Sequence, residues 1–432
     1  MEGPTPVSAL IHAATLVTAG VYLLLRSSPV IEYGPTTLIV ITWVGALTAF
    51  FAASTGLLQN DLKRVIAYST CSQMGYLFMA CGLSAYDTAL FHLVNHAFFK
   101  ALLFLAAGAV LHATYDQQDM RRLGGLQAFL PFTYTCILIG SLSLMALPWL
   151  TGFYSKDLIL EIAYGQYEFS GQVAYWFGSL SATLTAFYSF RLISMTFLTY
   201  PNAPKSVYNN THDAPTIVMV PLAILAILSV FFGYIASDLY VGMGSDFLGN
   251  SIFVHPSHIN LIEAETIPTF NKLLPLFLSL LGAGTSLYLY NILPTFLIGL
   301  TNNKIGYSLY KFFNGKYYVD VIYNHYIING GLQLGYVISK VLDRGIIELV
   351  GPYGLATGLG SGSSTISKLD TGNLTSYALY LAIALVTLVM ILLSPSLLGV
   401  ETMDIRITLI LVIGLLFLPY LTSNKNEKNS LY

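Results

Sequence analysis

The sequence predicts an all-α polytopic membrane protein with about ten transmembrane helices, including one broken helix, plus a lateral amphipathic helix. Of its 432 residues, 55% are hydrophobic and only 9% are charged, whereas soluble domains carry about 25% charged residues. Apolar runs of about 20 residues, the length that spans a bilayer as a helix, recur along the whole chain. The net charge of −2 gives no reason to expect a nucleic-acid partner.

The apolar runs define the expected spans in chain order. They are 7–25, 37–58, 64–83, 86–112, 131–147 with a continuation at 157–165, 172–198, 215–236, 272–292, 374–397 and 405–421. The fifth span is interrupted because Pro148 removes a backbone donor and clashes with the preceding turn, and Gly152 loosens the chain further. Broken helices at membrane depth are tolerated where the freed backbone groups line a wet cavity.

Lysine and arginine residues set the expected orientation of these spans. With the N-terminus on side A and the spans alternating, thirteen of the 19 basic residues fall on side A and three on side B. The other three, Lys100, Lys156 and Arg191, fall inside spans. Because basic loops stay inside, side A is predicted to be the cytoplasm or the matrix of a mitochondrion.

The stretch 316–350 mixes apolar and polar residues and is too polar to span a membrane. It is expected to lie along a membrane surface as an amphipathic helix. Gly330 and Gly331 are expected to weaken a continuous helix there. The following GLATGLGSGSST at 354–365 is expected to be a flexible connection back to the membrane.

His92, His96 and Lys100 lie four residues apart in the fourth span, which places them on one helix face. An ionisable group at mid-membrane costs a few kcal/mol and therefore needs a function or a partner. Locally hydrogen-bonded histidines and a snorkelling lysine are the alternative. Three groups in register, with Lys100 far from the helix end, instead predict a relay that passes a proton in small steps.

The broken helix carries a second charged group, in LPWLTGFYSKDLILE at 147–161. We expect Lys156 to lie at an exit half-channel, with Asp157 or Glu161 as a supporting counter-charge. An ordinary surface loop with charged residues is the alternative interpretation. No C-x-x-C pair, G-x-G-x-x-G or P-loop is present, so no cofactor, metal or nucleotide is expected on this chain.

Two further titratable residues fit a relay less distinctly. His12, in the small-residue helix SALIHAATLVTAG, is equally compatible with a satisfied buried histidine. Lys63 lies at a side-A helix end and is either an interfacial anchor or part of an entry half-channel. Polar side chains that could hold water there are those of Tyr68, Ser69, Thr70, Ser72 and Gln73. Arg191 is expected to snorkel or pair near side A and is given no transport role.

Several long motifs resemble the subunit 5 family of NADH:ubiquinone oxidoreductase (respiratory complex I). They are GPTPVSALIHAATLVTAG (3–20), LQNDLKRVIAYSTCSQMGY (58–76), FHLVNHAFFKALLFLAAG (91–108), RRLGGL (121–126), LTGFYSKDLIL (150–160), GKYYVDVIYN (315–324) and VLDRGIIELVGPYGL (341–355). The same chain resembles the large subunit of multi-subunit sodium/proton antiporters. The last two motifs are similar to the lateral helix of subunit 5.

The resemblance implies a proton-translocating membrane-arm subunit, with NADH, flavin, iron–sulfur clusters and quinone in partner subunits. Lys100 matches the family's central lysine of the second of two inverted repeats, and Lys156 matches the lysine at the broken helix. Lys63 matches a lysine on the helix entering from the matrix, and His12 the histidine linking the repeats. His92 and His96 match the residues that lead to the central lysine.

The implied domains are the last helix of the first antiporter-like repeat, the second repeat, additional helices, the lateral helix with its linker, and the C-terminal helices with the tail. Their expected bounds are 1–26, 27–200, 201–300, 301–370 and 371–432. Relative to the family, the chain starts just before the last helix of the first repeat. We therefore expect a separate polypeptide to supply the missing N-terminal helices, with an incomplete sequence as the alternative.

Partners are expected to be other membrane and peripheral subunits of complex I and membrane lipids. The expected location is the mitochondrial inner membrane, with a bacterial cytoplasmic membrane as the alternative. Two other functions remain open: a sodium/proton antiporter subunit, and a structural brace whose half-channel is idle.

Overall fold

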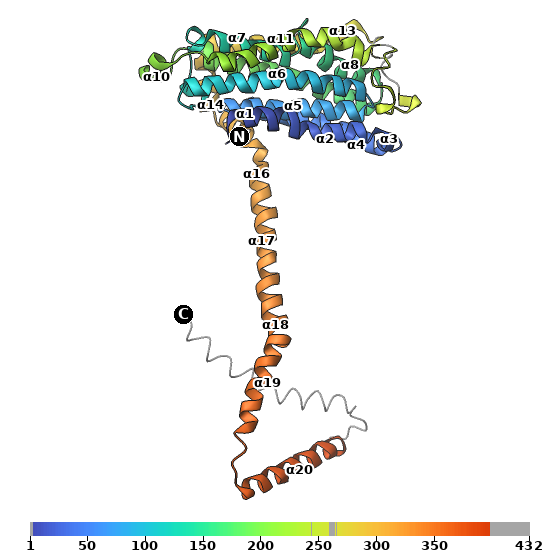
Figure 1. The fold of residues 1–432 in the computed structure, drawn as a ribbon, viewed down its shortest axis with the longest axis vertical. Helices are drawn as coiled ribbons and strands as arrows, with labels where there is room; N and C mark the ends of the chain where they lie inside the picture. The colour runs from blue at the N-terminus through green and yellow to red at the C-terminus, as the bar shows by residue number, and fades with distance from the viewer. Residues whose placement is uncertain (1–2, 243, 259–263, 265, 398–432) are drawn as a thin grey trace. The chain divides into compact units, whose positions relative to one another are not determined.

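The computed structural model describes residues 3–397 except 243, 259–263 and 265 (Figure 1). Within that range the regular elements are helices, so the predicted all-α class is confirmed. Extended pairing there is limited to one isolated bridge between Asp61 and Asp119. The chain forms two units, Met1–Tyr318 and Val319–Tyr432.

The first helices of unit 1 pack through small residues. In chain order they are α1 (Thr5–Val7), the π-helical η1 (Ser8–Thr15), α2 (Leu16–Arg26), α3 (Ser28–Ile31), α4 (Pro35–Gly56), α5 (Leu62–Gly82) and α6 (Tyr86–Ala113). A Cβ atom at Gly45 would lie 2.5 Å from the Met79 nitrogen, and one at Gly75 would lie 2.5 Å from the Ala49 nitrogen. Glycine at both positions therefore allows the backbones of α4 and α5 to approach closely.

The middle of unit 1 contains the broken helix. Its elements are η2 (Met120–Arg122), η3 (Leu126–Ala128), α7 (Pro131–Leu144), the π-helical η4 (Phe153–Asp157), α8 (Leu158–Gly165), α9 (Phe169–Ile193) and the π-helical η5 (Ser194–Leu198). Between α7 and η4 the chain turns through Ala146 and Trp149, both with positive φ. Gly152 follows, where a Cβ atom would collide with the Ser143 carbonyl. The chain thus breaks at the expected place.

The last part of unit 1 packs against α6, α7 and α9. Its elements are α10 (Lys205–Asn210), α11 (Thr216–Val241), η6 (Gly249–Ser251), η7 (Pro256–His258), α13 (Thr269–Leu287), η8 (Tyr288–Ile292), α14 (Pro294–Asn302), α15 (Lys304–Asn314) and η9 (Lys316–Tyr318). Helix α11 packs against α6 and α7, and α13 packs against α9. Helix α6 also contacts α5 and α7, so its side chains are enclosed by helices on several sides.

Five helical runs of the described residues are long and apolar enough to cross a membrane. They are Thr5–Arg26, Pro35–Gly56, Tyr86–Ala113, Thr216–Val241 and Thr269–Ile292. Helices α5 and α9 have 21 and 25 residues and more polar side chains. Helix α7 and the described part of α20 are shorter apolar helices. The expected span at 405–421 lies outside the described residues.

Unit 2 corrects one expectation. Its elements are α16 (Val319–Ile322), η10 (Tyr323–Ile328), α17 (Asn329–Tyr336), η11 (Val337–Ile347), α18 (Glu348–Val350), α19 (Pro352–Ser367) and α20 (Leu374–Leu397). The helical run passes through Gly330 and Gly331. The stretch expected to be a flexible connection is the helix α19. Low helix propensity is outweighed at a membrane because a helix satisfies its own backbone groups.

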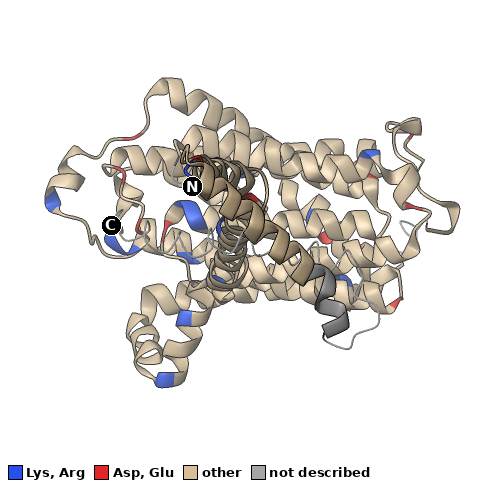
Figure 2. Ribbon diagram, turned by 90° about the horizontal axis from the view of Figure 1, so that it is seen from below, with Lys and Arg blue, Asp and Glu red and all other residues tan. Residues whose placement is uncertain are grey.

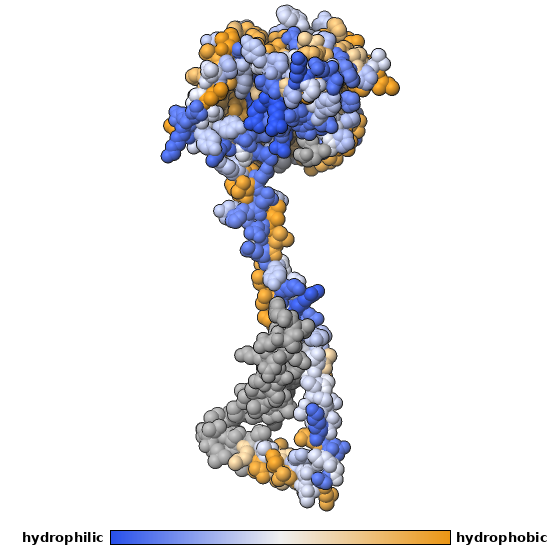
Figure 3. Space-filling model, turned by 90° about the vertical axis from the view of Figure 1, so that its left-hand side faces the viewer, coloured by the Kyte–Doolittle hydropathy of each residue, from blue (hydrophilic) through white to orange (hydrophobic). Residues whose placement is uncertain are grey.

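Charged residues are sparse along the helices, most of which are tan in Figure 2. Figure 3 faces the end of unit 1 that carries α10 and shows hydrophilic side chains gathered there, with hydrophobic side chains at the flanks. This is the end predicted to be side A. A polar end and apolar flanks are the arrangement expected of a bundle that crosses a bilayer.

Candidate functional site

The predicted row lies on one face of α6 and is fully buried. His92, His96 and Lys100 each have 0% of their surface exposed. The four-residue spacing keeps them on one face, as expected for an α-helix. Groups buried this far from water need hydrogen-bond partners, because transfer of an unpaired polar group from water is unfavourable. The neighbouring helices supply most of those partners.

His92 connects α5 to the broken helix. Its Nε2 atom lies 3.0 Å from the Gln73 Oε1 atom, and its Nδ1 atom lies 2.9 Å from the Ser155 hydroxyl. Because an amide oxygen only accepts, Nε2 of His92 carries hydrogen, and Nδ1 of the neutral ring accepts from Ser155. Ser155 directly precedes Lys156, so one histidine joins the row to the second lysine's segment.

Lys100 is held by α5 at the other end of the row. Its Nζ atom donates to the Ser69 hydroxyl over 2.6 Å. His96 lies between the two, and neither of its ring nitrogens has a hydrogen-bond partner among the described residues. Its ring instead packs edge-on against Phe99, with centroids 5.4 Å apart. Helix α5 therefore supplies a partner to each end of the row, while the middle member is unpaired.

Lys156 occupies the break itself and is 1% exposed. Its Nζ atom donates to the Thr185 hydroxyl over 3.2 Å and to the Leu144 carbonyl over 3.4 Å. Leu144 is the last residue of α7, and helix ends leave carbonyls without intrahelical partners. The ammonium group also lies 5.2 Å from the centroid of the Tyr76 ring, a cation–π contact. The break thus creates the site that holds the lysine, and the surface-loop interpretation is wrong.

The two expected counter-charges have different neighbours. Asp157 is buried beside Lys156. Glu161 forms an ion pair with Lys272, with 3.2 Å between the charged atoms. Glu161 lies one helical turn beyond Asp157, and Lys272 is half-exposed near the start of α13. The acidic pair thus leads from the buried lysine toward a side-B basic residue.

Lys63 and His12 differ in burial. Lys63 is 6% exposed, and its Nζ atom donates to the Gly3 carbonyl over 3.4 Å. Its neighbour Arg64 is half-exposed and lies 3.0 Å from Asp61. His12 lies on the exposed side of η1. The structure therefore places Lys63 inside the bundle but does not bring His12 to the row.

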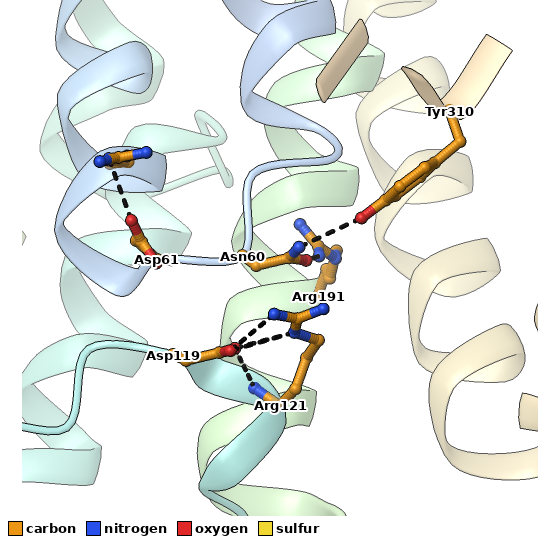
Figure 4. Close-up of polar contacts among 7 residues, drawn as sticks. Asn60, Asp61, Asp119, Arg121, Arg191 and Tyr310 are labelled. Atoms are coloured by element: carbon orange, nitrogen blue, oxygen red, sulfur yellow. Dashed lines mark hydrogen bonds and ion pairs between the residues drawn. The ribbon is translucent and has the colours of Figure 1, made fainter. Parts of the chain in front are cut away.

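A polar network that sequence reasoning missed holds the turn before Lys63 (Figure 4). Arg191 donates to the carbonyls of Leu57 and Gln59 over 2.9 and 2.6 Å, and to the Asn60 Oδ1 atom over 3.0 Å. Asn60 in turn donates to the Tyr310 hydroxyl on α15 over 3.2 Å. Pairing of Arg191 was expected, but its partners were not, because they lie more than 100 residues away.

The 118–120 segment also holds this turn through backbone hydrogen bonds. The Leu62 nitrogen donates to the Gln118 carbonyl, and the Met120 nitrogen donates to the Asn60 carbonyl. Asp119 beside this pairing accepts from Arg121, whose guanidinium holds the pKa of Asp119 below its usual value. Hydrogen bonds from the 118–120 segment therefore hold the backbone at the start of α5.

A cluster at the opposite end was also missed. The Glu32 side chain, 0% exposed, accepts from the His255 backbone nitrogen over 3.1 Å and lies 2.8 Å from the His258 Nδ1 atom. Burial raises the pKa of Glu32, but hydrogen bonds led by that of His258 outweigh it, so the pKa lies below its ordinary value. The cluster links the α11–α13 connection to the α3–α4 turn by hydrogen bonds. No local sequence motif predicts it.

Two family models match this chain. The model described as NADH:quinone oxidoreductase/Mrp antiporter, TM, matches residues 1–185. The model described as NADH dehydrogenase subunit 5 C-terminus matches residues 188–393. The first range contains the row and the broken helix, and the second runs from the end of α9 through α10 and α11 into α20.

Individual proteins are similar over almost the whole chain. NADH-ubiquinone oxidoreductase chain 5 of Mycosarcoma maydis is 80% identical over 99% of this chain, and that of Cryptococcus neoformans is 66% identical over 97%. The chain spans 64% and 63% of the length of these two relatives. A solved structure of the Mrp complex from Dietzia has a TM-score of 0.56 and 25% identity, covering 84% of this chain and 37% of that chain.

Proposed function

Because this chain belongs to the subunit 5 family of NADH:ubiquinone oxidoreductase, we propose that it is a proton-translocating membrane-arm subunit of that respiratory complex. The chain is a multi-pass protein of the mitochondrial inner membrane. The proposal assigns NADH, flavin, iron–sulfur clusters and quinone to other subunits, whose redox reaction supplies the energy. One observation carries it: Lys100, His96, His92 and Lys156 are all buried, and His92 lies within hydrogen-bond distance of Ser155, the residue before Lys156.

We infer the following order of proton transfer. A proton enters from side A, the matrix side, near Lys63, and is held on the Lys100 amine. It leaves by way of His96 and His92, each of which gains a proton and then releases one. Ser155 and Lys156 receive it at the broken helix, and Asp157 and Glu161 lead it toward side B. Each group returns to its starting protonation state, so one turn moves one proton.

The unpaired nitrogens of His96 support this route. Buried polar atoms usually have a partner in the protein or an ordered water. His96 lies one turn from both His92 and Lys100. Water beside its ring would connect the two hydrogen-bonded ends of the row.

The test is Lys100→Ala in the intact complex in inner-membrane vesicles, with exposed Lys205→Ala as the control. The measurement is protons pumped per NADH oxidised. We expect Lys100→Ala to lose the pumping that passes through this subunit. Lys205→Ala should pump as the unmodified complex does. Full pumping together with full quinone reductase activity in Lys100→Ala would refute the proposal and favour a structural brace. Sodium-dependent pumping in the unmodified complex would favour an antiporter, the class of protein named in the description of the first family model.

We also propose that further helices cover the face formed by η1, α2 and α4. Large apolar side chains are exposed on it, among them Leu10, Leu16, Leu23 and Val44. Lipid alone could cover such residues, but His12 is exposed on the same elements, and a titratable group facing lipid is unfavourable. Mass spectrometry of the native complex tests whether these helices belong to a separate polypeptide, as expected from the sequence.

A further inference from the structure

An open groove lies along helix α15 at side A. Its volume of about 630 Å³ falls within the range of ligand-binding sites. The polar part of its lining is Lys304, Ser308 and Lys311, and the apolar part includes Ile305, Leu309 and Phe312. No residue of the proposed proton route lines it, so the groove is separate from the row and from the broken helix.

The polar and the apolar lining lie on adjoining faces of one helix. Lys304 and Lys311 are seven residues apart, which is about two turns, so they share a face and lie about 10 Å apart along the helix axis. Ile305 and Leu309 lie about 100° to 140° further round the helix, and they are 70% and 52% exposed. A line of cations beside an apolar face is typical of a helix that lies in a membrane interface.

The opposite side of α15 is held by the bundle. The Tyr310 hydroxyl accepts a hydrogen bond from Asn60 over 3.2 Å (Figure 4). The Gln59 amide donates to the Asn314 carbonyl over 3.3 Å. Both contacts join α15 to the turn before α5, at side A. The groove therefore opens away from the bundle, at the level expected for the lipid headgroups of the side-A leaflet.

A strained turn forms one wall of the groove. Lys316, Tyr317 and Tyr318 have φ angles of 55°, 58° and 55°, in the left-handed region that is unfavourable for residues with a side chain. The turn brings the Tyr318 ring to 6.2 Å from that of Phe312, and Tyr318 lines the groove. The Tyr317 hydroxyl lies 2.8 Å from that of Ser54 on α4, which holds the turn in place. Backbone strain of this kind persists where surrounding contacts fix it, and it is frequent at ligand sites.

The cations of the groove are available to a ligand. Among the described residues, neither Lys304 nor Lys311 forms an ion pair. Lys311 lies over the Tyr307 ring, 4.6 Å from its centroid, a contact that positions the ammonium group without using an acceptor atom. The Ser308 hydroxyl donates to the Lys304 carbonyl over 3.0 Å and can still accept. The groove therefore fits a ligand with anionic oxygens, a hydroxyl group and an apolar part.

We propose that this groove binds one anionic phospholipid of the side-A leaflet. The phosphate lies between the two lysines, a headgroup hydroxyl donates to Ser308, and the first acyl carbons cover Ile305 and Leu309. Charge complementarity favours this occupant, because the lysines attract an anionic headgroup and repel the amine of a zwitterionic one. A free phosphate ion would leave the apolar face of the groove uncovered. The inference does not depend on proton pumping.

The test is a titration of the intact complex, purified in neutral detergent, with phosphatidylglycerol. Mass spectrometry counts the lipid molecules that each complex retains. Lys304→Gln with Lys311→Gln removes both cations of the groove, and Arg122→Gln with Lys205→Gln removes two exposed side-A cations that do not line it. The first pair should retain one phosphatidylglycerol fewer and bind it roughly 30-fold more weakly, given the contribution of each lysine near a membrane surface. The control pair should retain as many as the unmodified complex.

Two further measurements separate a lipid from other occupants. Leu309→Ser keeps both cations and removes an acyl-chain contact, so it should also weaken retention of phosphatidylglycerol. A high-resolution map of the unmodified complex should show a lipid along Ile305 and Leu309. Equal retention by the two double variants, retention that inorganic phosphate abolishes, or a segment of another subunit in the groove overturns the inference. Each of these results leaves the proposed pumping function standing, because that function is tested at Lys100.

Discussion

Replacing Arg191 should loosen the entrance to α5. The guanidinium is 4% exposed and donates to two carbonyls, of Leu57 and Gln59, at the end of α4. A hydrogen bond to a charged group contributes about 1.5–3 kcal/mol, and adjacent bonds are not additive, so Arg191→Ala should cost about 3 kcal/mol. Arg191→Lys keeps the charge but lacks the several donors of the planar guanidinium, so it should recover about half of the lost stability.

The assay is the melting temperature of the subunit within the purified complex, measured as the temperature at which the subunit loses its resistance to a protease. A loss of about 3 kcal/mol predicts a decrease of roughly 3 °C for a chain of 432 residues. Arg122→Ala is the control, because Arg122 is exposed and such substitutions stay within about 0.5 kcal/mol. Pumping should fall with stability, since Lys63 begins the helix that follows this turn. An Arg191→Ala complex that melts like the Arg122→Ala complex would refute the reasoning.

Two other substitutions test the broken helix and the side-B cluster. Gly152→Val should prevent assembly, because even a Cβ atom there collides with the Ser143 carbonyl. Gly284→Val is the control, because a Cβ atom at that position meets open space. Equal amounts of assembled complex for the two variants would contradict this prediction. Glu32 has a lowered pKa, so its stabilising contribution is complete above the ordinary value of 4.5 and is lost as the pH falls toward the lower value. Proteolysis of the 245–258 connection should therefore increase as the pH falls below about 4.5. The Glu32→Gln variant should be cleaved there already at pH 7. A digestion pattern of the native chain that does not depend on pH would be inconsistent with this prediction.

Local periodicity was enough to predict the row on α6, because a spacing of four residues fixes one helix face whatever packs against it. The break was predictable for a similar reason, since Pro148 cannot continue a helix. The partners of the row were only partly predictable. Ser69 and Gln73 were two of five polar residues expected to hold water near Lys63, whereas the structure shows them bonded to Lys100 and His92.

Contacts between distant segments were not predictable. Glu32 and His258 are 226 residues apart, and nothing in either local sequence specifies the other. Gly330 and Gly331 lie within α17, between two π-helical stretches, and their weakening of a continuous α-helix stays a prediction.

The contacts of α5 have a consequence for how the row can change state. Ser69 and Gln73 are one turn apart on one rigid helix, and they hold opposite ends of the row. A displacement of α5 along its axis by the length of a hydrogen bond would therefore disengage Lys100 and His92 in the same movement. On the proposed route, a partner that shifts α5 would therefore change the proton affinities of Lys100 and His92 simultaneously.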